Sequence, residues 1–249
     1  MNHAALNLLA FDTSTDHLSV AVQRGADGAR FAHTGAGGAQ SSATLIPTVQ
    51  ALLAQAGLQL RDLHAIVFGR GPGSFTGLRT ACSVAQGLAW GAGVPVLPVD
   101  TLLAVAEAAR QSHGAAPDGL RVLALLDARM GEVYTAEYAW SPAGWQTLAD
   151  AAVLPPEKVI APAREGVAVP PAGTLLAGNA AAVYAERLPA AVLALPRAEV
   201  LPTADALLNL APALLAAGRA VPAEQALPLY IRAKVAQTTA ERAAAGLAR

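Results

Sequence analysis

The stretch "GRGPGSFTGLR", from Gly69 to Arg79, decides how the chain must fold. The apolar run "AIVF" (65–68) leads into it, and apolar residues at helical spacing follow it. A strand that turns through several glycines into a helix is the usual form of an anion-binding loop, because the free N–H groups of a helix N-terminus attract negative charge. The loop therefore either binds a phosphate group or only has the shape of a phosphate loop.

The glycine loop departs from both common nucleotide motifs. A Walker loop needs G-x-x-x-x-G-K-[ST], and this stretch has no Lys. A dinucleotide loop needs G-x-G-x-x-G, but Ser74 stands at the third glycine position and Pro72 removes a backbone donor. Asp100 ends the next predicted strand, where a ribose-binding acid would stand. Alternatively, the glycines only permit a sharp turn, and Ser74 or Thr76 caps the helix.

The composition indicates a globular protein of the cytoplasm. The chain has 249 residues, a net charge of −1, a mean hydropathy of +0.40 and a single cysteine, Cys82, which is typical of a reducing compartment. The N-terminus lacks the pattern of a signal peptide. The uncharged stretch 80–99 contains Ser, Gln, Gly and Pro, so we expect a buried helix and strand there and no membrane span. A near-neutral chain is also unlike proteins that bind nucleic acid alone.

The first part of the sequence alternates between strand and helix patterns. Pro47 is expected in the first turn of its helix, where a missing N–H costs nothing. The order predicts an α/β fold with an antiparallel hairpin edge and parallel inner strands covered by helices. The expected strands are 7–14, 17–24, 29–34, 64–69 and 94–100, and the expected helices are 41–57, 75–93 and 101–111.

A Pro- and Gly-rich break at 112–119 indicates a lobe boundary. We expect a first lobe at 1–112, completed by a helix at 204–218, and a smaller second lobe at 113–203. In that second lobe, 120–140 reads as strand, turn and strand, and 174–178 as a further strand. Residues 228–232 are expected to be extended, and the Ala-rich tail 233–249 to fray.

Three segments together resemble the TsaB (YeaZ) family, whose members are needed to make threonylcarbamoyladenosine in tRNA. They are "LLAFDTSTDHLSVAV" (8–22), "FGRGPGSFTGLRTACSVAQGLA" (68–89) and "LLDARMGEVYTAEY" (125–138). The resemblance implies the two-lobed fold of actin-like ATPases, sugar kinases and heat-shock chaperones (the ASKHA, ribonuclease H-like fold), with the second lobe reduced. It also implies TsaD and TsaE as partners, a homodimer when the chain is alone, and contact with tRNA only through the complex.

The resemblance places two vestigial phosphate loops in the chain. Their residues are Asp12, Thr13, Ser14, Gly71, Gly73 and Ser74. In active kinases of this fold, an acid at the position of Asp12 helps to position metal-bound phosphate. The alternative is that Asp12 caps its own turn through the residues that follow it.

The resemblance also bears on catalysis. In TsaD, a segment like "PVLPVDTLLAVA" (95–106) carries His-x-x-x-His, whose histidines bind a metal. Thr101 and Val105 stand at those positions here, so we expect no metal, no cofactor beyond weak nucleotide affinity, and a non-catalytic, accessory role. Ser41 stands where many family members have a His.

Helices 41–57 and 75–93 carry one charge between them, Arg79. Because solvent-facing helices usually carry charges, we expect both to pack against the sheet and against a partner, as they do in the family. The alternative is that the same chain covers them. The predicted interface residues are Leu45, Val49, Leu52, Leu53, Leu78, Arg79, Cys82 and Gln86.

The segment "DARMGEVY" contributes Asp127, Arg129, Gly131 and Glu132, which form the family's signature turn. A β-turn with a local Asp–Arg contact is one interpretation, and an acid–base pair of Asp127 and Glu132 is another. A peptidase is disfavoured, because Ser74 lacks the G-x-S-x-G elbow. The second functional hypothesis is an ATP-dependent small-molecule kinase that binds Mg–ATP between the lobes, although the second lobe is short for that role.

Overall fold

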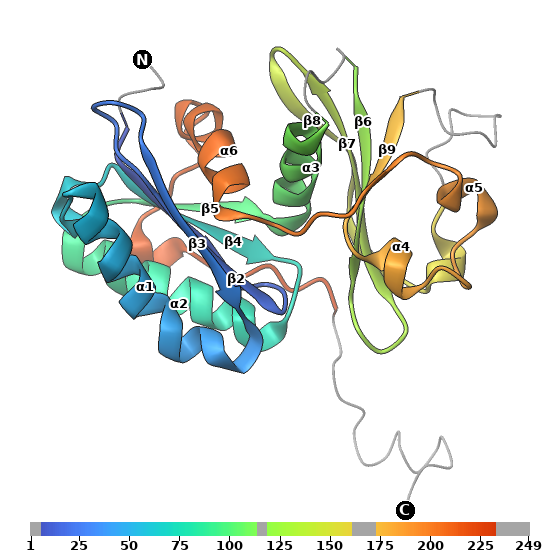
Figure 1. The fold of residues 1–249 in the computed structure, drawn as a ribbon, viewed down its shortest axis with the longest axis horizontal. Helices are drawn as coiled ribbons and strands as arrows, with labels where there is room; N and C mark the ends of the chain where they lie inside the picture. The colour runs from blue at the N-terminus through green and yellow to red at the C-terminus, as the bar shows by residue number, and fades with distance from the viewer. Residues whose placement is uncertain (1–5, 114–118, 161–172, 233–249) are drawn as a thin grey trace, which may run out of the picture.

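The computed structural model describes residues 6–113, 119–160 and 173–232, which form two lobes side by side (Figure 1). The first lobe is built on a five-stranded sheet of order β3-β2-β1-β4-β5. β2 is antiparallel to both β1 and β3, whereas β1, β4 and β5 run parallel. The strands are β1 (Leu8–Asp12), β2 (His17–Gln23), β3 (Arg30–Ala36), β4 (Ala65–Gly71) and β5 (Val96–Asp100).

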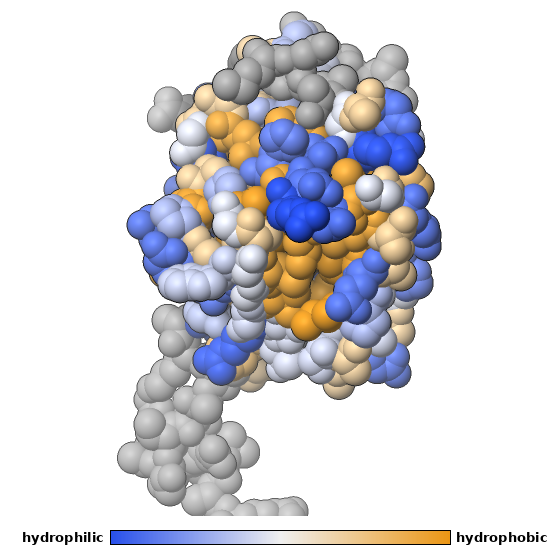
Figure 2. Space-filling model, turned by 90° about the vertical axis from the view of Figure 1, so that its left-hand side faces the viewer, coloured by the Kyte–Doolittle hydropathy of each residue, from blue (hydrophilic) through white to orange (hydrophobic). Residues whose placement is uncertain are grey.

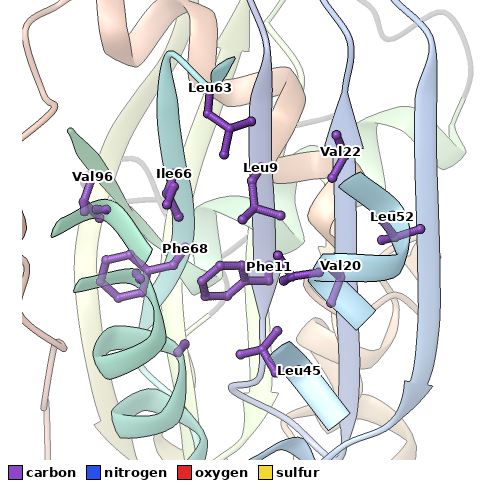
Figure 3. Close-up of a cluster of buried hydrophobic side chains, with 14 of the residues drawn as sticks. Leu9, Phe11, Val20, Val22, Leu45, Leu52, Leu63, Ile66, Phe68 and Val96 are labelled. Atoms are coloured by element: carbon purple, nitrogen blue, oxygen red, sulfur yellow. The ribbon is translucent and has the colours of Figure 1, made fainter. Parts of the chain in front are cut away.

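Helices cover both faces of this sheet. Leu9 and Phe11 of β1 face α1 (Ser41–Ala56) and α2 (Phe75–Ala92), as Figure 3 shows for the strand residues and for Leu45 and Leu52 of α1. The alternate residues Leu8 and Ala10 face the other layer, which includes α3 (Thr101–Ser112) and α6 (Ala204–Ala216). Burial on both faces explains why β1 and β4 are almost continuously apolar.

The second lobe repeats the same plan with shorter helices. Its sheet has the order β10-β9-β6-β7-β8, in which β7 is antiparallel to β6 and β8, and β9 is parallel to β6 and β10. The strands are β6 (Arg121–Asp127), β7 (Val133–Ser141), β8 (Gly144–Leu154), β9 (Thr174–Ala177) and β10 (Arg197–Ala198). The helices are α4 (Ala180–Val183) and α5 (Ala190–Leu193), and the short 3-10 turns of the two lobes are η2 (Gly38–Gln40), η3 (Leu60–Asp62), η4 (Pro156–Lys158) and η5 (Ala223–Gln225).

Most predicted elements are present, and two details differ. The long edge strand β8 is not among the predicted strands, because its middle, residues 146–150, is exposed and lacks a clear apolar alternation. Pro47 lies inside α1, beyond its first turn, because the helix already begins at Ser41, so the predicted position is wrong. Pro47 is exposed, so water can bind the Ala43 carbonyl that it leaves without an amide donor.

The apolar stretch 80–99 forms most of α2 and of β5. The prediction of a buried helix is wrong, because only one side of α2 is buried and its other side, which includes Ser83 and Trp90, is exposed. Within residues 6–113, 119–160 and 173–232, every helix is too short or too polar to cross a bilayer. The predicted frayed tail, 233–249, and most of the predicted break at 112–119 lie outside the described residues.

Candidate functional site

The two predicted phosphate loops pack against each other at the ends of β1 and β4. The amide of Ser74 donates to the Ser14 carbonyl at 2.7 Å, and the Thr13 hydroxyl donates to the Gly77 carbonyl at 2.7 Å. A Cβ atom on Gly77 would lie 1.8 Å from the Thr13 oxygen, and one on Gly73 would lie 2.6 Å from Ser14. The glycines therefore allow close backbone contact, and the Ser74 side chain caps α2 as predicted.

Asp12 is buried behind these loops and does not line the cleft described below. Its Oδ1 accepts hydrogen bonds from the Ser14 amide at 2.8 Å and the Ser14 hydroxyl at 2.6 Å. Burial raises the pKa of Asp12 to about 6, against the lowering effect of those hydrogen bonds. The geometry is that of an acid that caps its own turn, which was one of the two interpretations.

The signature turn joins β6 to β7 in an unusual backbone conformation. Arg129, Met130 and Gly131 have φ angles of 60°, 55° and 75°, so three successive residues are left-handed. The Arg129 amide donates to Asp127 Oδ1 at 2.8 Å, and the Arg129 guanidinium lies 3.1 Å from Asp127 Oδ2. The predicted turn with a local Asp–Arg contact is therefore confirmed.

The turn also connects distant parts of the chain. Arg129 forms an ion pair with Asp16 of the first lobe, and Glu132 forms one with Arg232 near the C-terminus. The Tyr184 hydroxyl donates to Asp127 Oδ1 at 2.7 Å. Both carboxylates that could have formed an acid–base pair are thus bound by arginines, and the turn links the two lobes.

A cleft of about 670 Å³ lies where these loops meet. The segment before Arg232 forms part of its wall: the Leu229 amide donates to the Arg70 carbonyl at 2.7 Å, and a Cβ atom on Gly71 would lie 2.6 Å from the Leu229 oxygen. The structure thus brings loop residues and signature-turn residues together in one cavity, whose lining includes Ser14, Gly73, Ser74, Asp127, Arg129 and Arg232.

The predicted interface residues require a correction. Leu45, Val49, Leu52, Leu53, Leu78 and Cys82 are buried in the chain's own core. The Gln86 side chain donates to the Ala226 carbonyl at 2.8 Å, and the Cys82 thiol donates to the same oxygen at 3.3 Å. Only Arg79 of the predicted set is exposed. The apolar face of each helix belongs to the sheet, so the six buried residues are wrong as partner contacts, whereas the assignment of Gln86 and Arg79 stays a prediction.

The outward faces of α1 and α2 are different from these buried faces. Ile46 on α1 is 42% exposed and Phe75 on α2 is 44% exposed, and Arg79 is the only charged residue on the two helices. Seen from the left-hand side of Figure 1, the molecule displays a broad hydrophobic surface beside hydrophilic residues (Figure 2). A shallow groove of about 440 Å³ lies on these outward faces, lined by Ser42, Phe75, Thr76, Arg79, Thr80, Ser83 and Val84. We call it the α1–α2 groove.

Thr101 and Val105, for which no metal-binding role is expected, are used in packing. The hydroxyl of Thr101 accepts a hydrogen bond from the Gly71 amide at 3.1 Å, and Val105 is fully buried. In the described part of the chain, no group of three or more His, Cys, Asp or Glu side chains is arranged to hold a metal ion. The expectation of a chain without a metal stays a prediction.

Known proteins match this chain over most of its length. The model of the family "TsaD: tRNA N6-adenosine threonylcarbamoyltransferase" matches residues 34–240. YeaZ from Pseudomonas aeruginosa is a close structural neighbour: it is 39% identical, has a TM-score of 0.78, and the match covers 90% of this chain and 99% of that one. With the two mixed sheets, these similarities confirm the predicted ASKHA fold of two lobes, the second one reduced.

Similarity to curated proteins is more specific. The tRNA threonylcarbamoyladenosine biosynthesis protein TsaB of Escherichia coli K12 is 38% identical over 233 residues, which cover 93% of this chain and 96% of that one. TsaB of Haemophilus influenzae is 44% identical over 131 residues, 52% of each chain. The chain belongs to the TsaB family.

Proposed function

We propose that this protein is a non-catalytic subunit of the machinery that makes threonylcarbamoyladenosine next to the tRNA anticodon, and that it binds and activates a TsaD-type partner. The observation that carries the proposal is the outward surface of α1 and α2, where exposed Ile46 and Phe75 accompany a single charge, Arg79. A helix face that remains in water usually carries more charge than this. Family membership supplies the partner, because the E. coli relative is named for the same pathway.

A non-catalytic role fits the groups that are present in the cleft. Asp16 and Asp127 line the cleft but are paired with Arg129, and Asp12 is buried on its own turn. No carboxylate among the described lining residues is left to bind Mg–ATP without first breaking an ion pair. This argues against the kinase hypothesis, and any nucleotide affinity is expected to be weak.

The remaining parts of the proposal follow from the family. TsaE, the ATPase of the system, joins the pair, and tRNA is contacted only through the complex. Alone, the chain forms a homodimer. The complex acts in the cytoplasm, where its tRNA substrate is found.

Sedimentation of the protein with TsaD from the same organism tests the proposal. We expect a heavier mixed species that displaces any homodimer. Ile46→Asp should weaken this species by tenfold or more, because a carboxylate would have to lose water in the interface. Leu148→Asp, on β8 of the second lobe, is the matched control, since Leu148 is 37% exposed and Ile46 is 42% exposed. No mixed species, or equal binding by both variants, would contradict the proposal.

A further inference from the structure

Among the residues that the structure describes, Arg79 has aromatic and hydroxyl neighbours but no acid as an ion-pair partner. Its Nε donates to the Tyr230 hydroxyl at 3.1 Å, and its guanidinium carbon lies 3.8 Å from the centre of the Phe75 ring. Arg79 is in none of the ion pairs formed within residues 6–113, 119–160 and 173–232. The α1–α2 groove therefore displays a cation whose charge the described chain leaves without a carboxylate.

The position of Arg79 is fixed from the C-terminal side of the chain. The Tyr230 ring packs on Phe75 with a centroid distance of 5.2 Å. Backbone on one side of Tyr230 is held by the Leu229–Arg70 hydrogen bond, and Arg232 on the other side is held by Glu132. Because the guanidinium is already held in place, the Arg79 side chain loses little further conformational entropy when a ligand binds it.

The rest of the groove indicates what kind of surface fits there. Apart from Phe75, Arg79 and Val84, its lining consists of the small hydroxyl residues Ser42, Thr76, Thr80 and Ser83. Small side chains allow another backbone to approach closely, and hydroxyls can donate to or accept from a polar edge. A complementary surface would be apolar or small, with one acidic side chain opposite Arg79.

The facing helices of a second copy do not supply that acid. In a two-fold dimer, the same helices contact each other, and α1 and α2 contain no Asp or Glu. Such a dimer offers Arg79 no carboxylate from these helices, and it brings two like charges to one interface. The charge pattern thus favours a different chain over a second copy.

We propose that Arg79, positioned by Tyr230, makes this face bind a TsaD-type partner in preference to a second copy of the chain. That partner places a carboxylate against the Arg79 guanidinium. This inference rests on the proposed function, which assigns the face to that partner. Arg79 supplies the charge, and Tyr230 is a positioning residue that acts through it.

The first test replaces the charge. Arg79→Gln should weaken binding of TsaD by about tenfold, the loss typical of a partly buried charge-assisted pair, and should flatten its dependence on salt. Self-association, measured by sedimentation of the chain alone, should be unchanged or stronger. Arg219→Gln is the matched control, because Arg219 is an exposed arginine that follows α6 on the opposite face of the sheet. Equal weakening of both associations would overturn the proposal.

The second test addresses positioning. Tyr230→Phe keeps the ring on Phe75 but removes the oxygen that accepts from Arg79. We expect about threefold weaker TsaD binding in the otherwise unchanged protein, the cost of one hydrogen bond, and no further effect in the Arg79→Gln background. A purely structural role of Tyr230 would give the same loss in both backgrounds, and that result would overturn the positioning claim.

Ile46→Asp tests separately whether this face binds TsaD and whether Arg79 gives it the preference for TsaD. If Ile46→Asp abolishes TsaD binding and Arg79→Gln leaves it unchanged, this face does bind TsaD, but the role proposed for Arg79 is wrong. If both variants bind TsaD as the unchanged protein does, the proposed face itself is wrong.

Discussion

The two lobes share one plan and differ in their helices. The strand orders β3-β2-β1-β4-β5 and β8-β7-β6-β9-β10 are the same when read from the antiparallel edge. The central strand of each lobe ends in an aspartate, Asp12 or Asp127, whose Oδ1 accepts the amide two residues further on at 2.8 Å. In the first lobe α1 and α2 have 16 and 18 residues, whereas α4 and α5 of the second lobe have four each.

This difference gives the two lobes different outward surfaces. Helices of four or five turns have an inward face that covers the sheet and an outward face that can bind another chain. Helices of one turn fill a gap over the sheet, and their lobe offers little outward helical surface. The first lobe is therefore the one suited to docking, and the second lobe contributes the turn that connects the two.

The largest expected effect tests whether both lobes depend on the same close backbone contacts. A Cβ atom on Gly77 would lie 1.8 Å from the Thr13 oxygen, and one on Gly178 would lie 2.0 Å from the Leu125 oxygen. Gly77→Ala and Gly178→Ala should each lower the free energy of unfolding by about 3 kcal/mol in urea titrations. Gly87→Ala, with no atom within 4 Å of its Cβ position, is the control and should gain about 0.5–1 kcal/mol. If only one of the two variants, Gly77→Ala or Gly178→Ala, lost much stability, the two lobes would not depend equally on close backbone contacts.

A second prediction concerns the two aspartates. The pKa of Asp12 is about 6 in the folded chain, above its ordinary value of 3.8, so the native state keeps this proton longer than the unfolded state does. Stability linked to Asp12 is therefore full below about pH 4 and is lost as pH rises through about 6. The gain in stability from Asp12→Asn, relative to the unchanged protein, should grow by about 2 kcal/mol between pH 4 and pH 7.

Urea unfolding at several pH values measures this difference. Asp127→Asn is the matched variant, and it should lower stability at pH 7 because Asp127 has Arg129 as a partner. The same difference between Asp12→Asn and the unchanged protein at every pH would show that burial does not raise the pKa of Asp12 in the folded chain.

The smallest expected effect concerns the signature turn. Arg129→Ala removes the ion pairs with Asp16 and Asp127 but keeps a left-handed residue, so it should cost about 1 kcal/mol. Arg129→Gly removes the same two pairs and relieves the backbone, so it should be about 1 kcal/mol more stable than the alanine variant. Thermal unfolding of the two variants compares them directly, and equal midpoints would show that the turn is not strained.

Local rules predicted much of the fold, and they failed where the answer depends on distant residues. The alternation of strands and helices, the Ser74 cap and the Asp127–Arg129 contact are all set by neighbours in sequence. Helical periodicity identified an apolar face on α1 but could not tell whether the sheet or a partner covers it. The Arg79–Tyr230 hydrogen bond joins residues 151 positions apart, so no local pattern indicates it.

Hydroxyl-radical footprinting of the protein with and without TsaD tests most directly whether the first lobe is the docking lobe. Four exposed side chains serve as reporters: Ile46 and Phe75 in the first lobe, and Leu148 and Val183 in the second. We predict that TsaD lowers the labelling of Ile46 and Phe75 and leaves that of Leu148 and Val183 unchanged. Protection of Leu148 or Val183, with Ile46 and Phe75 labelled as before, would contradict the account.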